Sequence, residues 1–387
     1  MNVLLLDGHT IQALPMMKAL CKKHISVTIF CEQRISYGYF SRYAKSKIIC
    51  PSPKHNEIDY LYFLKNFLQK HPQDYVIPLF NDSAEFVSKY KEQIEACGCK
   101  VEIPTWSTFI KAHDKEQLMQ ICKLLAIPHP RTANPEKIGY QKAIEYVKYP
   151  CLIKPNLGAG AKGIKLLRNK TDFDKYYAQT LKEFGPSCIQ EFIPQNGKQY
   201  KVQLYRDEHY GIIASSIYEK CRYYPLDGGT STCNRTITRP DLVELYAKIL
   251  EHINWIGIAD FDCIEDPRDN SVKLMEINPR VPGTIKASFI SGIDFAEIMT
   301  DHLCGNTYKT YTYRPDKILR NLATELLWFY ESKERFNTTP NWFHFIGKDI
   351  YYADGSWEDP FPMIAGFING IKKLSNANFR KSKNKNK

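Results

Sequence analysis

Short apolar runs alternate with amphipathic, helix-length stretches over residues 1–105. The apolar runs occupy residues 3–6, 27–30, 48–50 and 76–80. This alternation predicts a small parallel, Rossmann-like sheet. The first run reads as a strand rather than as a signal peptide, because an Asp follows it almost at once. The next loop reads DGHT instead of G-x-G-x-x-G, so the sequence gives little support to a dinucleotide site.

Two loops of this predicted sheet are marked for a ligand, because ligands prefer the carboxyl ends of parallel strands. They are residues 8–10 (Gly-His-Thr) and residues 81–83 (Asn-Asp-Ser), the second with Glu85 nearby. Helix capping explains Asp82 and Ser83 equally well.

Residues 106–195 carry the pattern of a second unit. A helix is expected from the Asp114 N-cap until Ile127-Pro128, and residues 149–155 predict a strand with an inward Lys154. The strand runs into NLGAGAKG, where glycines allow backbone amides to approach phosphate oxygens and a lysine adds charge. Taken alone, such a glycine-rich hairpin is more often an ordinary turn.

Residues 196–310 predict an antiparallel sheet with helices. KVQLYRD and YGIIASSIYEK read as a strand pair, residues 240–254 as an amphipathic helix, and residues 288–303 as one further helix. Strands at 258–264 and 272–278, joined by EDPRDNS, form a hairpin centred near Asp269.

This hairpin places Asp262 opposite Glu276, and directly opposite residues point to the same face of a sheet. Asn278 shares that face, and Asp260 has the same parity. Hard carboxylate and amide oxygens beside Arg280 suit Mg²⁺. The alternative interpretation of the charges alone is a solvated hairpin face.

The string MEINPR (residues 275–280) resembles a segment of the ATP-grasp superfamily in which the Glu and Asn ligate magnesium and the Arg contacts phosphate. Lys115, Lys154, the loop 158–163 and CIQEFIP precede it in the order found in that family. The resemblance covers residues 1–310 and implies an α/β (α+β) ATP-grasp fold. The expected parts are a Rossmann-like pre-ATP-grasp domain (1–105), a lid subdomain (106–195), a catalytic core (196–310) and a C-terminal extension (311–387) with a disordered basic tail.

By position, the resemblance implies a nucleotide site. Lys115 and Lys154 would hold the α- and β-phosphates. The segment that forms the interdomain hinge in that family, here Glu191 to Ile193, would bind adenine. Gln199 stands near the place where family members have an acidic ribose contact, and it retains the ability to bind a hydroxyl. The remaining nucleotide residues are Gly158, Gly160, Lys162 and Gly163 in the mobile loop, and Glu191, Phe192 and Ile193 in the hinge.

The resemblance also implies the catalytic residues. Asp262, Glu276 and Asn278 would hold one or two Mg²⁺ ions, with Mn²⁺ as a substitute, and Arg280 would stabilise the transferring phosphoryl group. Lys220 and Arg222 lead towards the Gly228-Gly229 turn, and basic residues there suit an acyl phosphate or second substrate. An exposed strand with Lys and Arg is an equally good interpretation.

Together these features imply a carboxylate–amine ligase, similar also to the carbamoyl-phosphate synthase large subunit. It would activate a small carboxylate with ATP as an acyl phosphate, which an amine attacks, releasing ADP and phosphate. The alternatives are a carbamoyl-phosphate-synthase-like protein with a carboxyphosphate-type intermediate, and an ATP-binding module without catalysis. Dimers are frequent among similar proteins, so a homodimer is the assembly to test.

The composition of the chain indicates which ligands and which cellular compartment to expect. A formal charge of +11 over 387 residues suits acidic ligands such as nucleotides, whereas no aromatic-plus-basic module indicates nucleic acid. Twelve cysteines without a signal favour a reducing cytoplasm. No apolar run approaches the roughly 20 residues of a membrane span. The last helix is apolar and basic, which leaves docking against the core or contact with a membrane surface open.

Overall fold

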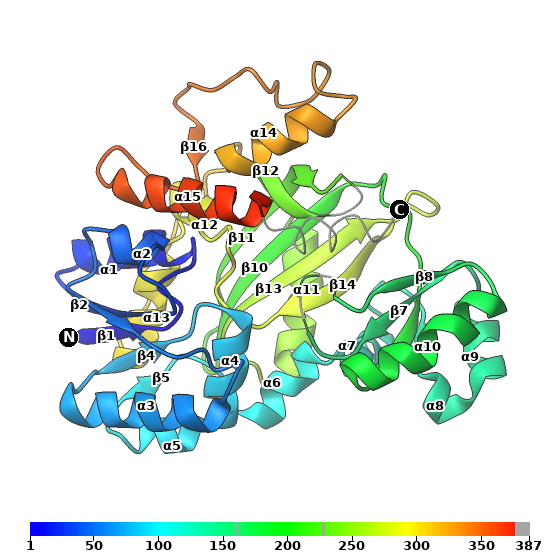
Figure 1. Cartoon of the computed structure of the whole chain (residues 1–387), viewed down its shortest axis with the longest axis horizontal. Helices are drawn as coiled ribbons and strands as arrows, with labels where there is room; N and C mark the ends of the chain where they lie inside the picture. The colour runs from blue at the N-terminus through cyan, green and yellow to red at the C-terminus, as the bar shows by residue number, and fades with distance from the viewer. Residues whose placement is uncertain (159, 161, 227–228, 376–387) are drawn as a thin grey trace.

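The computed structural model describes residues 1–375 except 159, 161 and 227–228 (Figure 1). Its described strands form three sheets, of five, four and seven strands. The sheets follow one another along the chain, in residues 2–101, 132–191 and 199–352.

The first sheet is parallel, with strand order β3-β2-β1-β4-β5, which confirms the predicted Rossmann-like sheet. Leu4 and Phe30 are buried in one apolar cluster, and Leu5 and Ile29 in another. A strand buried on both faces needs a continuous apolar run, which is what the sequence provides. The elements are β1 (Asn2–Leu5), α1 (Ala13–Lys22), β2 (Ser26–Cys31), α2 (Tyr37–Phe40), β3 (Ser46–Ile49), α3 (Glu57–Lys70), β4 (Tyr75–Ile77), α4 (Asn81–Lys89), α5 (Lys91–Glu95) and β5 (Lys100–Val101).

The second sheet is antiparallel, with order β6-β9-β7-β8, and has a small core of its own that includes Val147, Ile153 and Ile189. It lies at the opposite end of the molecule from the N-terminal sheet (Figure 1). A unit with its own core can move as a body. Its elements, with the two helices that lead to it, are α6 (Trp106–His113), α7 (Lys115–Leu124), β6 (Thr132–Ala133), α8 (Pro135–Ile138), α9 (Tyr140–Val147), β7 (Cys151–Pro155), β8 (Lys165–Leu167), α10 (Lys170–Phe184) and β9 (Ser187–Glu191).

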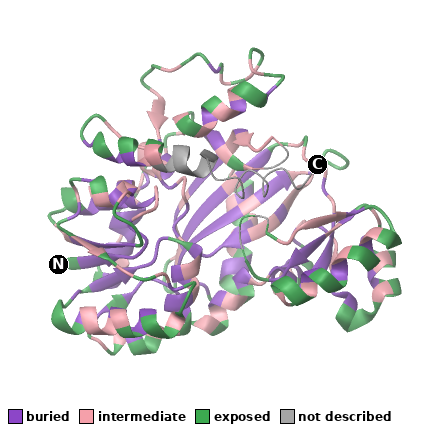
Figure 2. Ribbon diagram, viewed as in Figure 1, coloured by how far each residue is buried: buried purple, intermediate pink, exposed green. Residues whose placement is uncertain are grey.

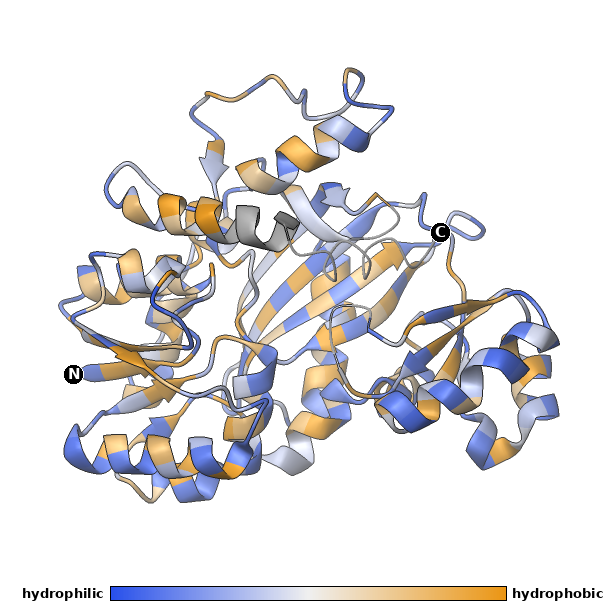
Figure 3. Cartoon of the chain, in the orientation of Figure 1, coloured by the Kyte–Doolittle hydropathy of each residue, from blue (hydrophilic) through white to orange (hydrophobic). Residues whose placement is uncertain are grey.

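The third sheet has the order β14-β13-β10-β11-β12-β15-β16. Helix α11 covers one face, where Tyr246 stacks on Phe261 with ring centroids 5.0 Å apart. Apolar and polar residues alternate along these strands (Figure 3), so the opposite face is polar. The elements are β10 (Gln199–Asp207), β11 (Gly211–Tyr224), β12 (Thr230–Ile237), α11 (Pro240–His252), β13 (Gly257–Glu265), β14 (Val272–Asn278), α12 (Lys286–Ile290), α13 (Phe295–Cys304) and β15 (Ile318–Arg320).

The single helix predicted over residues 288–303 is wrong, because the chain forms α12 and α13 with a break at Gly292. Gly292 has a φ of +94°, and a Cβ there would lie 2.5 Å from the carbonyl oxygen of Thr312. Only glycine accepts this conformation and this close approach without strain.

The C-terminal segment is partly built into the third sheet. Its strands β15 and β16 (Ile350–Tyr352) extend that sheet, and α14 (Leu322–Glu331) contacts β11 and β12. Helix α15 (Phe361–Ser375) docks against α2, with Ala365 buried and Phe361 and Phe367 exposed (Figure 2). The predicted basic tail lies outside the described residues. Within the described part of the chain, every helix is too short or too polar to traverse a bilayer.

Candidate functional site

The hairpin of β13 and β14 has the predicted register. Asp262 pairs with Glu276, and Asp260 pairs with Asn278. A register shift follows Asp262, on the side of the turn, so it does not disturb these two pairs. All four side chains therefore share the polar face of the third sheet, opposite α11.

Two lysines from neighbouring strands contact these carboxylates. Lys201 of β10 lies opposite Asp262 in the ladder, and its Nζ is 2.6 Å from Asp260 and 2.5 Å from Asp262. Lys220 of β11 donates to the other oxygen of Asp262 at 2.7 Å. Burial would raise the pKa of Asp262, but the two lysines outweigh burial and hold that pKa below its ordinary value.

Asp260 differs from Asp262 because it is completely buried and, among the described residues, has an ion pair with Lys201 alone. Burial raises the pKa of Asp260 in spite of the neighbouring Lys201. Its Oδ1 has no hydrogen-bond partner within the described residues. This oxygen is therefore available to a water molecule or a cation.

The donor set fits magnesium. Within the described residues, no group of three or more His, Cys, Asp or Glu side chains is placed to hold a metal ion. The face instead offers the carboxylates of Asp262 and Glu276 and the amide oxygen of Asn278. Mg²⁺ typically takes one or two carboxylates and completes its shell with water and phosphate.

Arg280 joins this hairpin to the N-terminal unit. Its Nη2 donates to Asn278 Oδ1 at 3.3 Å, and its Nε donates to Asn81 Oδ1. Asn81 is buried at the start of α4, in one of the two loops marked at the carboxyl ends of the parallel strands. The Ser83 hydroxyl of the same loop instead donates to Asp7, so that residue supports the fold.

Lys115 and Lys154 come together beside the glycine-rich loop. Lys115 begins α7, whose N-cap Asp114 accepts from the backbone of Gln117 as predicted, and Lys115 Nζ donates to the Gly158 carbonyl at 2.9 Å. Lys154 is buried in β7, and burial lowers its pKa while the charge of Glu276 opposes that effect. Lys154 thus lies within electrostatic reach of the hairpin.

Three glycines of the glycine-rich loop have backbone conformations that other residues rarely adopt. Gly158, Gly160 and Gly163 have positive φ values of 111°, 73° and 74°. A Cβ at Gly163 would lie 2.7 Å from Pro155 Cγ. Lys162 is exposed, and the alanines at 159 and 161 lie outside the described residues.

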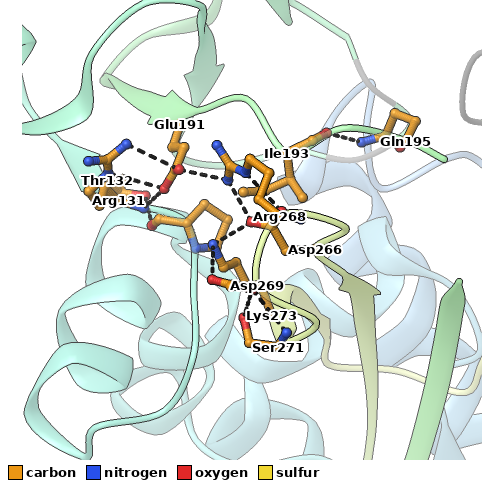
Figure 4. Close-up of polar contacts among 11 residues, drawn as sticks. Arg131, Thr132, Glu191, Ile193, Gln195, Asp266, Arg268, Asp269, Ser271 and Lys273 are labelled. Atoms are coloured by element: carbon orange, nitrogen blue, oxygen red, sulfur yellow. Dashed lines mark hydrogen bonds and ion pairs between the residues drawn. The ribbon is translucent and has the colours of Figure 1, made fainter. Parts of the chain in front are cut away.

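The hinge residue Glu191 binds two arginines with its side chain (Figure 4). Arg131 donates from Nε at 3.2 Å and from Nη2 at 3.1 Å, and Arg268 donates from Nη2 at 2.8 Å. These contacts lower the pKa of Glu191 although burial acts in the opposite direction. Arg268 belongs to the EDPRDNS turn, so the carboxylate links the hinge to the hairpin.

The rest of the hinge is arranged around Gln195. Ile193 is buried and its carbonyl accepts from Gln195 Nε2 at 2.8 Å, whereas Phe192 is half-buried. Gln199 Nε2 lies 3.4 Å from Gln195 Oε1. Gln199 therefore lies next to the hinge.

The two basic residues predicted on β11 have different surroundings. Lys220 joins the carboxylate face, but Arg222 is buried against Glu325, with bonds of 2.9 and 2.7 Å. Strand alternation would put residues 220 and 222 on one face, but the ladder shifts register between them. Arg222 has a structural partner in place of the predicted substrate. The turn predicted at Gly228-Gly229 lies partly outside the described residues.

Three participants were not identified as such from the sequence. Lys201 was not singled out from the sequence, although its parity with Gln199 on a strand next to the hairpin is a usable signal. Arg131 and Arg268 carry no local signal, because their meeting at Glu191 depends on long-range folding.

Parts of this chain are similar to known proteins. A family model described as "ATP-grasp in the biosynthetic pathway with Ter operon" matches residues 227–324. The carbamoyl phosphate synthase large chain, C-terminal section, of Methanopyrus kandleri is 27% identical over 208 residues, covering 50% of this chain and 38% of the relative. The D-aspartate ligase of Enterococcus faecium is 25% identical over 240 residues, covering 56% of each protein. The chain thus spans less than two thirds of these relatives.

Among solved structures, the biotin carboxylase domain dimer of Hydrogenobacter thermophilus 2-oxoglutarate carboxylase, in complex with MgADP and bicarbonate, is similar. The TM-score is 0.68 at 16% identity, and the match covers 82% of this chain and 73% of that one. At this identity the likeness concerns the fold, and the chain has the ATP-grasp fold.

Proposed function

From the ATP-grasp fold of this chain, we propose that the protein is an ATP- and Mg²⁺-dependent ligase that activates a carboxylate for attack by an amine. The observation that carries the proposal is the pairing of Asp262 with Glu276 on one face, with Asn278 and Arg280 adjoining. Curated relatives of ligase and synthase type support the same reaction class.

Phosphoryl transfer depends mainly on positioning and charge neutralisation. Lys115 and Lys154 would neutralise the α- and β-phosphates. The contact of Lys115 with the start of the glycine-rich loop and the proximity of Lys154 to Lys115 support this role. Asp262, Glu276 and Asn278 would hold magnesium, which supplies charge neutralisation at the phosphates when bound. Arg280 would stabilise the charge that develops on the transferring phosphoryl group.

The lid would protect the activated intermediate. In the proposed four-part division at residues 105, 195 and 310, residues 106–195 would be a mobile unit. Its glycine-rich loop (Gly158, Gly160, Lys162, Gly163) would close over the phosphates and exclude water. Adenine would lie against Phe192 and Ile193 and would be recognised by hinge backbone groups. Gln199 would bind the ribose.

The substrates are proposed by class. A small carboxylate and an amine fit the relatives, one of which is a D-aspartate ligase. The second candidate is a carboxyphosphate-type reaction, favoured by the carbamoyl phosphate synthase relative and by the bicarbonate in the similar biotin carboxylase. We further propose Mn²⁺ as a substitute metal, a homodimer, since that similar domain is a dimer, and a cytoplasmic setting for the twelve free cysteines.

The proposal is tested by measuring ADP and phosphate release from Mg·ATP with pooled amino acids, small carboxylates and bicarbonate. Release that requires one pool, together with a new amide product detected by mass spectrometry, is the expected result. ATP binding without release in any pool would favour the non-catalytic module. Release with bicarbonate alone would favour the carboxyphosphate reaction.

A further inference from the structure

Asp262 is bound by cations on both of its oxygens. Lys201 contacts Oδ2 at 2.5 Å and Lys220 contacts Oδ1 at 2.7 Å, while Asn278 Nδ2 donates to Oδ2 at 3.0 Å. Both lysine side chains are largely buried, each with a relative exposure of 13%. These contacts occupy three of the roughly four acceptor positions of the carboxylate, so a metal ion either takes the remaining position on Oδ1, beside the Lys220 ammonium group, or displaces one of the contacts.

The two lysines are not equivalent. Lys201 has a second carboxylate, because Asp260 accepts from it at 2.6 Å and is completely buried. For Lys220, Asp262 is the sole ion-pair partner within the described residues. Lys201 can therefore release Asp262 and keep a charge partner, whereas Lys220 can do so only by turning to another anion.

The charges around Asp262 determine how metal binding and the lysine contacts affect each other. Asp260 and Asp262 together balance the two lysines, and Glu276 and Lys154 lie close enough to interact. A divalent cation added beside two ammonium groups meets repulsion at short range, which is strong away from bulk water. Metal binding and lysine contact at Asp262 should therefore compete.

We propose that Lys201 and Lys220 neutralise Asp262 in the absence of the metal. When the metal binds Asp262, the two lysines release this carboxylate, and Lys201 stays paired with Asp260. The proposal rests on the proposed function, since it assumes a metal–nucleotide complex at Asp262. The lysines act here as positioning residues, through Asp262. Lys220, released by the exchange, becomes free for an anionic substrate, so loading of the metal and binding of the carboxylate are linked.

The test measures the response to Mg²⁺ in the full-length protein at saturating ADP. Mg²⁺ is titrated while the unfolding temperature and the heat of binding are followed. The variants are Lys220→Met and the double change Lys201→Met with Asp260→Asn, which replaces a buried ion pair without leaving a charge unpaired. Lys273→Met is the matched control, because this lysine lies on the same hairpin but pairs with Asp266 at the turn.

Each of the two test variants should bind Mg²⁺ about tenfold more tightly than the unchanged protein, as expected for loss of a competing charge at this distance. The control should lose stability without a change in Mg²⁺ affinity. Unchanged or weaker Mg²⁺ binding in both test variants, with a normal response in the unchanged protein, would overturn the exchange and leave the ligase proposal standing. If the unchanged protein shows no Mg²⁺-dependent stabilisation with ADP, the proposed function fails and the exchange fails with it.

Discussion

Individual charged residues carry the candidate chemistry, and burial determines how strongly they act. Lys154 lies in the interior of β7, within the field of Glu276. In such a place a charge interacts more strongly than it would in water. An anionic ligand would therefore gain more from Lys154 than from the exposed Lys162 in the loop.

Lys154→Met is expected to weaken ATP binding by roughly 10–100-fold, since a charge-assisted contact contributes about 1.5–3 kcal/mol. Because methionine fills similar space and removes a buried charge, the fold should survive. Displacement of a fluorescent ATP analogue measures the affinity, with Lys162→Met as the exposed control. Equal losses in the two variants would contradict the special role of the buried lysine.

At the scale of helices and strands, some pairings could be predicted from the sequence and others could not. Alternation and parity were enough to place Asp262 opposite Glu276, because a hairpin register depends on local pattern and turn position. The irregularity between Lys220 and Arg222 has no such pattern, so the sequence did not show that Arg222 would lie against Glu325. The Glu191 ion pairs also depend on residues distant in sequence.

Glu325 of α14 binds Arg222 and Arg320 and is completely buried. Changing Glu325 to Gln leaves two buried arginines without their counter-charge, which costs about 3–5 kcal/mol of unfolding free energy. Urea denaturation measures this loss, and Glu331→Gln at the exposed end of the helix is the control. A loss below about 1 kcal/mol would show that the ion group does not anchor α14.

At the scale of the whole molecule, a buried polar network ties the N-terminal sheet to the core. Glu102, just after β5, accepts from Tyr205 of β10 and lies 3.3 Å from His302 Nδ1 on α13. Asp207 lies 3.8 Å from the other ring nitrogen of His302 and accepts from Tyr308. The hydrogen bond with Glu102 raises the pKa of His302, and burial opposes it.

This raised pKa predicts a pH dependence of stability. The contribution of protonated His302 is fully present below its unfolded pKa of about 6.5 and is lost as the pH rises through the higher folded value. Urea unfolding from pH 5 to pH 9 should show this loss, and His302→Gln should flatten it. Equal slopes for the two proteins would exclude His302 as the source.

The central claim is that the β13–β14 hairpin is the centre of ATP-dependent chemistry, and Glu276→Gln tests it most directly. Glutamine keeps the shape and removes one carboxylate from the proposed magnesium site, so acceptor-dependent ADP release should fall by at least about 100-fold, roughly 2.7 kcal/mol. Glu251→Gln, an exposed change on α11, should retain full activity with an unchanged unfolding temperature. Full turnover in the Glu276→Gln protein would contradict the assignment of this hairpin.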